Sequence, residues 1–471
     1  MGRLIVVSNR VQPPDAAGAG ATGGLAVALS AALREYSGLW FGWSGETVDA
    51  FTGHLSMRKV GGVTLALMDL DEHDVHEYYN GYANRTLWPL FHYRTDLVAY
   101  ERSFDEGYAR VNARFAESLL PLIEPDDLIW VQDYHLLPLA RALRRRGARN
   151  PIGFFLHIPW PARQIFTTLP RHAELVEALF DYDLIGFQTA DSLQAFADYV
   201  KESAGGEVLP GGIAMAFGKR ARIGAFPIGI DVAEITEGLK SDRAKAEFER
   251  VRASLLGRKM ILGVDRLDYS KGLEERFLAY EQYLEDHPEG REHVFLLQIA
   301  TPTRDEVEAY QDIRGRLESL SGRINGAYAD VDWVPVRYVN KTYRRDALTG
   351  IYHAAHVALV TPLRDGMNLV AKEYVAAQDP DDPGVLVLSE QAGAAEQMRE
   401  ALIVNPFNRE AVAEAIRRGL AMPLAERKDR WQALFDGVST DDVAAWRDSF
   451  VAALKNEATA YQPLRASANA R

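Results

Sequence analysis

Short apolar runs rich in Val, Ile and Leu alternate along the chain with longer segments whose apolar residues recur at helical spacing. Such runs are typical of strands buried on both faces, as in parallel sheets that helices cover on each side. The runs are RLIVVSN, DLIWVQD, IGFFLHI, LIGFQTA, KMILGVD, VFLLQIA, VALVTPL and VLVLSE; the helical segments include LAVALSAALREY, GYARVNARFAESLLPLI and RAKAEFERVRASLL. This alternation predicts an α/β fold.

The number of expected strands favours two doubly wound units over one. The Pro-Gly break in AFPIGIDVAEI, followed by an acidic helix start at Asp231, marks the expected join. We expect an N-terminal domain over residues 1–230, a C-terminal domain over 231–455 and a disordered tail over 456–471. Ligands of such sheets bind at the carboxyl ends of strands, which here predicts an interdomain cleft. A (β/α)₈ barrel is the alternative, and the break near Pro227 counts against it.

Composition narrows the class of protein. Of 471 residues, 47% are hydrophobic and 25% charged, which is ordinary for a soluble protein with a large core. The net charge, 53 − 66 = −13, argues against nucleic acid as a partner. The absence of cysteine excludes disulfides, thiolate metal sites and cysteine nucleophiles. Without a signal-peptide pattern or a bilayer-length apolar run, we expect a cytoplasmic protein with no membrane partner.

The most polar strand-to-helix junction is TPLRDGMNLVAKEYVAAQ, residues 361–378. Free N–H groups in the first turn of the following helix can bind a diphosphate. Asp365, before that helix, and Glu373, within it, can accept hydrogen bonds from sugar and ribose hydroxyls. A tight Asp-Gly turn followed by an exposed charged helix is the structural alternative.

A second junction, GVDRLDYSKG, follows the strand KMIL. Arg266 and Lys271 lie on either side of an expected bend, so both can converge on one anion. The planar fork of Arg and the point charge of Lys suit a diphosphate. The alternative is a surface ion-pair network with Asp265 and Asp268.

Weaker candidates lie in the N-terminal half. Asp133 and His157 end strands in VQDYHL and FLHIPWP, although a lone histidine there is more often a packing residue. Gly23 and Gly24 close the loop VQPPDAAGAGATGG just before a helical pattern, where backbone amides can approach a phosphate. A tolerated surface insertion is the alternative for this loop.

Metal chemistry is not expected. His353 and His356 are spaced without the glutamate of an HExxH motif, and no other tight ligand cluster stands out in the sequence. A nucleophile elbow and a Walker A sequence are also missing.

In combination, these motifs resemble the trehalose-6-phosphate synthase family. The resemblance covers roughly residues 1–455 in the family's order and rests on SNR at Ser8–Arg10, WFGWSGE, YYNGYANRTLWPLFHYR, VQDYHLLPLA, HIPWP, GVDRLDYSKG and LRDGMNLVAKEYVAAQ. It implies a glycosyltransferase-B fold, with two Rossmann-like domains facing a cleft. It also implies glucose transfer from UDP-glucose to glucose 6-phosphate with retention, giving α,α-trehalose 6-phosphate and UDP.

The resemblance assigns roles to individual residues. Donor binding falls to Gly23, Gly24, Arg266, Lys271, Tyr343, Asp365, Glu373 and the backbone of Leu369 and Val370. Acceptor binding falls to Arg10, Tyr79, Trp88, Asp133 and Arg304, and His157 matches the histidine near the transferred sugar. The catalytic set is then Asp133, His157, Arg266, Lys271 and Asp365, without cofactor or metal. One departure is Gln391, where the family usually has an aromatic residue before Ala-Gly.

Several alternatives stay open at this level. The enzyme could use another acceptor, such as glycerol 3-phosphate, or an ADP- or GDP-sugar donor. A sugar-phosphate sensor with little turnover is the alternative of a different class, and the intact Arg266, Lys271, Asp365 and Glu373 argue against it. A homodimer or homotetramer is also open.

Overall fold

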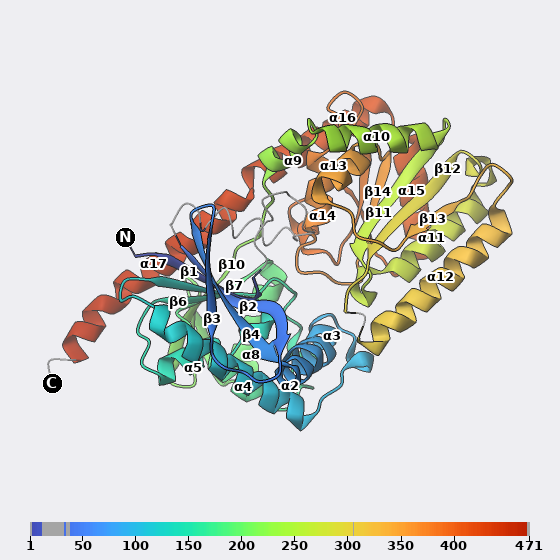
Figure 1. Ribbon diagram of the computed structural model, residues 1–471. Coiled ribbons are helices and arrows are strands. Elements are labelled where there is room, and N and C mark those ends of the chain that lie inside the picture. The colour runs from blue at the N-terminus through green and yellow to red at the C-terminus, as the bar shows by residue number, and fades with distance from the viewer. Residues whose placement is uncertain (1, 12–32, 34–37, 305, 469–471) are drawn as a thin grey trace. The chain divides into compact units, whose positions relative to one another are not determined.

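The apolar runs form strands at the centres of two units. The computed structural model describes residues 2–11, 33, 38–304 and 306–468, with side chains up to residue 457 (Figure 1). Of these, residues 2–11, 33, 38–228 and 444–468 form unit 1, and residues 229–304 and 306–443 form unit 2. No helix in the described ranges is both long and apolar enough to cross a membrane.

Unit 1 is built on a sheet with a parallel centre and antiparallel hairpins at both edges. Its strand order is β3-β4-β2-β1-β5-β6-β7-β10-β9-β8. The order reverses between β1 and β5, which pair in parallel from Leu4 opposite Leu128. The strands are β1 Leu4–Arg10, β2 Leu39–Val48, β3 Leu55–Val60, β4 Val63–Asp71, β5 Leu128–Gln132, β6 Ile152–Phe155, β7 Leu184–Phe187, β8 Glu207–Leu209, β9 Ile213–Ala216 and β10 Lys219–Ala225.

Helices connect the parallel strands of unit 1, and one more helix, α17 at Val443–Ala468, joins this unit from the C-terminal side of unit 2. The connecting helices include a π-helix, η1, at Val75–Leu87, which is an uncommon geometry often found at functional sites. The others are α2 Glu72–Asp74, α3 Trp88–Phe91, η2 Thr95–Leu97, α4 Arg102–Leu119, η3 Leu120–Leu122, η4 Tyr134–Leu136, α5 Leu139–Arg145, α6 Arg163–Phe166, α7 His172–Leu179 and α8 Ala190–Glu202.

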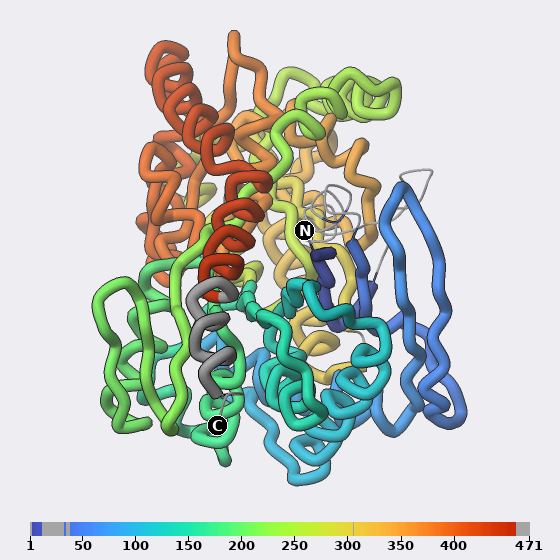
Figure 2. The backbone as a smooth tube through the Cα atoms, turned by 90° about the vertical axis from the view of Figure 1, so that its left-hand side faces the viewer, coloured from blue at the N-terminus to red at the C-terminus, as the bar shows by residue number. Residues whose placement is uncertain are grey.

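The last helix departs from the sequence-based prediction. Residues 444–455 were expected in the C-terminal domain and 456–471 as a disordered tail, but α17 is helical to Ala468 and its residues from 444 belong to unit 1. The reason is apolar packing: the Phe450 ring stacks on Trp130 of β5 at 4.6 Å between centroids. In Figure 2, α17 is the red helical tube.

Unit 2 has a fully parallel sheet of order β13-β12-β11-β14-β15-β16. Its strands are β11 Lys259–Arg266, β12 Val294–Thr301, β13 Val336–Val339, β14 Val357–Val360, β15 Val385–Ser389 and β16 Leu402–Val404. Its helices are α9 Val232–Gly238, α10 Asp242–Leu255, η5 Tyr269–Lys271, α11 Leu273–Asp286, η6 Pro288–Gly290, α12 Glu308–Tyr328, α13 Arg345–His353, α14 Leu369–Ala376, η7 Gly393–Glu396, α15 Arg409–Ala421 and α16 Leu424–Thr440.

This strand order is that of a dinucleotide-binding, doubly wound sheet, with its reversal between β11 and β14. The prediction of two Rossmann-like units is therefore confirmed, and the barrel alternative is wrong because both sheets are open. In such sheets ligands bind outside the carboxyl ends of the strands at the reversal point. Both polar junctions of the sequence follow strands that flank this point.

Candidate functional site

The two polar junctions of unit 2 meet at the strand reversal. The Lys271 ammonium group, after β11, forms an ion pair with the Asp365 carboxylate, after β14. Asn368 Nδ2 donates a hydrogen bond to the same carboxylate oxygen at 3.1 Å. Motifs that are far apart in sequence therefore place one cation and one carboxylate side by side at the ligand end of the sheet.

The backbone around Asp365 is held by the turn that follows β15. The Asp365 amide donates to the Gln391 carbonyl at 3.1 Å, and the Gly393 amide donates to the Asp365 carbonyl at 3.2 Å. The Gln391 side chain accepts a hydrogen bond from Arg364 Nη2 at 2.8 Å. The residue that departs from the family pattern thus binds Arg364 through its side chain and Asp365 through its backbone.

Helix α14 begins directly after this turn. Asn368 adopts a left-handed conformation, with φ of 75°, and reverses the chain so that the helix starts at Leu369. The amides of Leu369 and Val370 fall in the first helical turn, where backbone N–H groups lack intrahelical acceptors. Both residues are half-buried, and the binding role of their amides stays a prediction.

Glu373, further along α14, has two partners from α13. Arg345 Nη2 lies 3.3 Å from Glu373 Oε1, and the Tyr352 hydroxyl donates to Glu373 Oε2 at 3.4 Å. Burial raises the pKa of Glu373, and the Arg345 guanidinium acts in the opposite direction. Arg345 was not predicted from sequence, because the residues around it do not indicate that its helix, α13, packs beside Glu373 of α14.

The family resemblance assigns Glu373 to the donor, where it would accept a hydrogen bond from the ribose. On that prediction, Glu373→Gln is expected to raise the dissociation constant for UDP about tenfold, since a charge-assisted hydrogen bond contributes about 1.5 kcal/mol. Titration calorimetry with UDP measures the change, and Glu410→Gln on the exposed side of α15 is the matched control. An unchanged dissociation constant would mean that Glu373 only balances the charge of Arg345.

A second cluster of unit 2 surrounds the fully buried carboxylate of Asp268. The Tyr310 hydroxyl donates to Asp268 Oδ2 at 3.1 Å, Arg304 Nη1 lies 3.7 Å from it, and Arg266 Nη2 lies 3.9 Å from it. Arg304, assigned to the acceptor, therefore shares a carboxylate with Arg266, assigned to the donor. The side chain of Arg266 is 44% exposed and that of Arg304 only 7%, so Arg266 is the more accessible to a ligand.

The structure gives little or no information on three of the residues assigned to the donor. Tyr343 lies just before α13, with Lys341 Nζ 5.3 Å from its ring centroid, and its role stays a prediction. Gly23 and Gly24 lie outside the described residues.

In unit 1, Asp133 directly follows β5 and Arg10 is the last residue of β1, and these two strands flank the strand reversal. Asp133 has a φ of 72°, a conformation that is costly for a residue with a side chain and is concentrated at functional sites. Its amide donates to the Phe155 carbonyl at 2.7 Å, and its Oδ1 accepts from the His157 amide at 3.2 Å. Asp133 and His157, both predicted at strand ends, are therefore neighbours.

The His157 ring lies between two buried glutamines that sequence analysis did not single out. Its Nε2 lies 2.8 Å from Gln132 Oε1, and its Nδ1 lies 3.3 Å from Gln188 Nε2. One nitrogen faces an acceptor and the other a donor, which suits a neutral ring with its proton on Nε2. Burial correspondingly lowers the pKa of His157 to about 3.

This pKa predicts acid sensitivity. The unfolded chain takes up a proton on His157 near its ordinary pKa of 6.5, and the folded chain does so only near 3, so stability falls as pH drops between these values. The loss between pH 6.5 and 5 is about 1.6 kcal/mol. His157→Gln should remove it, measured by denaturant unfolding at both pH values, whereas His54→Gln, at an exposed position, should not. Equal pH dependence in wild type and His157→Gln would contradict this prediction.

The other predicted acceptor residues of unit 1 are joined by ring contacts. The Arg10 guanidinium lies 5.7 Å from the Trp43 ring centroid, and Trp43 meets Tyr79 edge-on at 5.6 Å. Tyr79 stacks on His135 at 6.0 Å. The Arg10 guanidinium lies against Gly45, where a Cβ would be 2.3 Å from Arg10 Nη2, and the φ of 92° at Gly45 favours glycine at this position.

Trp88 continues the same aromatic group through Tyr134, which lies 5.7 Å away between ring centroids and follows Asp133 directly. Trp88 is only 4% exposed, so its ring packs behind the more exposed residues of this group. Trp43 and His135 were not assigned roles from sequence, although both lie inside quoted motifs, WFGWSGE and VQDYHLLPLA.

Among the described residues, one group of side chains is close enough to hold a metal ion: Asp71, His73 and Asp74, with ligand atoms within 4.8 Å of one another. Arg114 Nη1 pairs with Asp71 at 2.8 Å, and Arg110 Nε pairs with Asp74 at 2.9 Å. Arginines therefore already neutralise both carboxylates. Sequence analysis did not identify this group.

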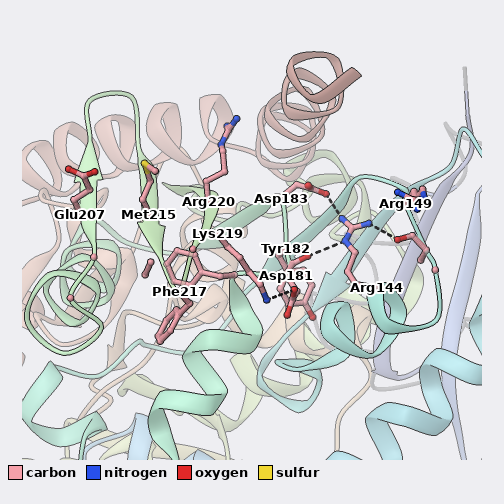
Figure 3. Close-up of a pocket in the computed structure, with 17 residues that line it drawn as sticks. Arg144, Arg149, Asp181, Tyr182, Asp183, Glu207, Met215, Phe217, Lys219 and Arg220 are labelled. Carbon is pink, nitrogen blue, oxygen red and sulfur yellow. Dashed lines mark hydrogen bonds and ion pairs between the residues drawn. The ribbon is translucent and has the colours of Figure 1, made fainter. Parts of the chain in front are cut away.

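A cavity of about 1060 Å³ lies elsewhere in unit 1, at the amino ends of β6 and β7 (Figure 3). None of the predicted site residues lines it. Four of its charged groups form two pairs: Lys219 Nζ binds Asp181 at 2.7 Å, and Arg144 Nη2 binds Asp183 at 2.7 Å. Since ligands of parallel sheets bind at the carboxyl ends, we assign the chemistry to the strand-reversal sites.

Known proteins match this chain over nearly all of its length. A curated trehalose-6-phosphate synthase of Klebsiella pneumoniae is 51% identical over 97% of this chain and 96% of the relative. The crystal structure of an α,α-trehalose-phosphate synthase (UDP-forming) from Burkholderia xenovorans, in complex with glucose-6-phosphate, is 51% identical, covers 96% of this chain and 100% of that one, and has a TM-score of 0.93.

A solved E. coli structure with UDP-2-fluoro glucose bound is 48% identical, covers 96% of this chain and 99% of that one, and has a TM-score of 0.92. The sequence profile of glycosyltransferase family 20 matches residues 5–456. The resemblance noted in the motifs therefore extends over both units, and the chain belongs to glycosyltransferase family 20.

Proposed function

We propose that this glycosyltransferase is a UDP-forming α,α-trehalose-phosphate synthase. It transfers glucose from UDP-glucose to glucose 6-phosphate, with retention at the anomeric carbon, and so acts in trehalose biosynthesis. The observation that carries the proposal is the pairing of Lys271 with Asp365 at the strand reversal of unit 2, in a chain about half identical to named synthases. A cytoplasmic location and a dimeric or tetrameric assembly stay predictions.

Cleavage of the bond between the anomeric carbon and the diphosphate oxygen develops negative charge on the leaving group. Lys271 and Arg266 supply cations for it, and the amides of Leu369 and Val370 supply oriented N–H groups. As Lys271 turns to the diphosphate, the Asp365 carboxylate becomes available to accept a hydrogen bond from a sugar hydroxyl. Catalysis then comes mostly from positioning and electrostatic stabilisation of the leaving group.

Unit 1 supplies the groups for the acceptor and the transferred sugar. Asp133 accepts a hydrogen bond from an acceptor hydroxyl, and the neutral ring of His157 faces the transferred glucose without adding charge. Reaction takes place on one face of the sugar. The bond from the anomeric carbon to the acceptor oxygen forms as the bond to the diphosphate breaks, and the acceptor proton passes to a leaving phosphate oxygen.

Turnover assays with a panel of substrates test the proposal. UDP-, ADP- and GDP-glucose are each paired with glucose 6-phosphate and with glycerol 3-phosphate, and the product is identified by mass and anomeric configuration. We expect UDP-glucose and glucose 6-phosphate to be the best pair. A higher kcat/KM with glycerol 3-phosphate would identify a different synthase, and binding without turnover of any pair would identify a sensor.

Turnover is expected to continue in excess chelator, because Arg266 and Lys271 supply the positive charge that a metal would otherwise bring to the diphosphate. The initial rate is measured with and without EDTA. Complete loss of activity, restored by Mg²⁺ or Mn²⁺, would overturn this expectation and direct attention to Asp71, His73 and Asp74.

A further inference from the structure

Arg276 is a cation inside unit 2 with only 1% of its surface exposed. It lies on α11, the helix that follows the junction carrying Arg266 and Lys271. Its Nη1 donates to Asp265 Oδ2 at 2.5 Å and to Gln298 Oε1 at 2.8 Å. Its Nε donates to Thr361 Oγ1 at 3.0 Å, and its Nη2 donates to the Lys271 carbonyl at 3.4 Å.

These partners come from three neighbouring strands. Asp265 is in β11, Gln298 is in β12, and Thr361 directly follows β14. Position 263 of β11 makes space for the network, since a Cβ on Gly263 would lie 2.2 Å from the Gln298 side-chain oxygen and 2.6 Å from Arg276 Nη1. One guanidinium thus joins the carboxyl ends of the strands on both sides of the reversal point.

The turn that carries Lys271 is also tied to the segment that leads to Asp365. The Leu363 amide donates to the Ser270 carbonyl at 2.9 Å. A Cβ on Gly272, whose φ is 65°, would lie 2.3 Å from the Thr361 carbonyl oxygen, so the two backbones touch there. Arg276 binds both Thr361 and the Lys271 carbonyl, so its buried guanidinium links the two segments that touch at Gly272.

A buried ion pair is rarely needed for stability, because the cost of removing both charges from water is of the same size as their attraction. A planar guanidinium that donates to four acceptors on different segments of the chain has another effect: it holds those segments in one relative geometry. We propose that Arg276 is a positioning residue for the donor diphosphate: it fixes the Lys271 backbone and the end of β11, and with them Arg266, relative to Asp365. This inference rests on the proposed function, in which Lys271 and Arg266 bind the leaving group.

The double variant Asp265→Asn/Arg276→Met removes the charge pair without leaving either charge buried alone. We expect kcat to fall about 10- to 100-fold, because a displacement of about 1 Å of a catalytic group has an effect of this order. KM for glucose 6-phosphate should change less than about threefold, and the thermal midpoint should stay close to that of wild type, since uncharged replacements of buried pairs are often neutral.

The matched control is Glu281→Gln/Arg323→Met, which removes a bidentate pair between α11 and α12, with both distances 2.6 Å, that touches neither donor junction. Its kcat should equal that of wild type. A wild-type kcat in Asp265→Asn/Arg276→Met would overturn the proposal.

Arg276→Lys separates positioning from simple charge balance, and it serves also if the double variant does not fold. Lysine keeps a cation beside Asp265 but cannot reach Gln298, Thr361 and the Lys271 carbonyl together. We expect kcat to remain at least about tenfold below wild type. A wild-type kcat in Arg276→Lys would reduce Arg276 to a counter-charge and overturn the inference. Failure of the proposed function is seen separately, in a wild-type enzyme that makes no trehalose 6-phosphate.

Discussion

Replacing Lys271 by alanine is expected to lower kcat/KM for UDP-glucose about 10- to 150-fold, the equivalent of one charge-assisted hydrogen bond of about 1.5–3 kcal/mol. The loss should fall mostly on kcat, because charge on the diphosphate develops in the transition state. Arg266→Ala should behave in the same way. Steady-state kinetics with varied donor at saturating acceptor measure both constants.

Lys428→Ala is the control, since Lys428 forms an exposed ion pair with Asp381 at 3.3 Å. It should leave the kinetics unchanged, as exposed pairs contribute little. Near-wild-type kcat in both Lys271→Ala and Arg266→Ala would mean that the junction after β11 is only a network of ion pairs.

Plain glucose is expected to be a very poor acceptor, with kcat/KM about 100- to 10,000-fold below that of glucose 6-phosphate, if two charge-assisted contacts to the phosphate are lost. Arg10 and Arg304 are the predicted partners of this phosphate, one in each unit. Arg10 ends β1 with an exposed side chain, which suits contact with a ligand.

A comparison of variants and substrates tests the role of Arg10. Arg10→Ala should raise KM for glucose 6-phosphate about 10- to 150-fold, yet leave the slow turnover of glucose unchanged. An equal loss with both acceptors would show that Arg10 only supports the Trp43 ring. Arg304→Ala should likewise raise KM for glucose 6-phosphate, without changing UDP affinity in the absence of acceptor.

The strands and the strand-end sites were predictable because they depend on local patterns. Apolar runs bounded by Gly, Asp and Pro mark buried strands, and parallel sheets bring the carboxyl ends of those strands to one edge. That rule alone placed Asp365 and Lys271 at the same edge. Asp133 and His157 were predicted only as strand-end residues, and their contact at 3.2 Å follows from the pairing of β5 with β6, which the structure shows.

The residues that were missed owe their places to tertiary packing. Arg276 and Arg345 lie on helices in ordinary polar patterns, and nothing local shows that one is buried or that the other faces Glu373. The partner of α17 was equally hidden. The Phe450 ring of α17 lies against Gly153 and Gly186, far back in the chain, and no local pattern links these positions.

These two glycines have a consequence for synthesis of the protein. A Cβ on Gly153 would lie 2.8 Å from the Phe450 ring, and a Cβ on Gly186 would lie 2.7 Å from it. The sheet of unit 1 therefore leaves space for the side chain of a residue that is synthesised some 300 positions later. Domains usually fold in the order in which the ribosome releases them. Here we expect the first unit to emerge to be completed last, because Trp130 packs on Phe450, which follows all the strands of unit 2 in the chain. A nascent chain stalled before α17 should therefore carry a folded second unit and an aggregation-prone first one.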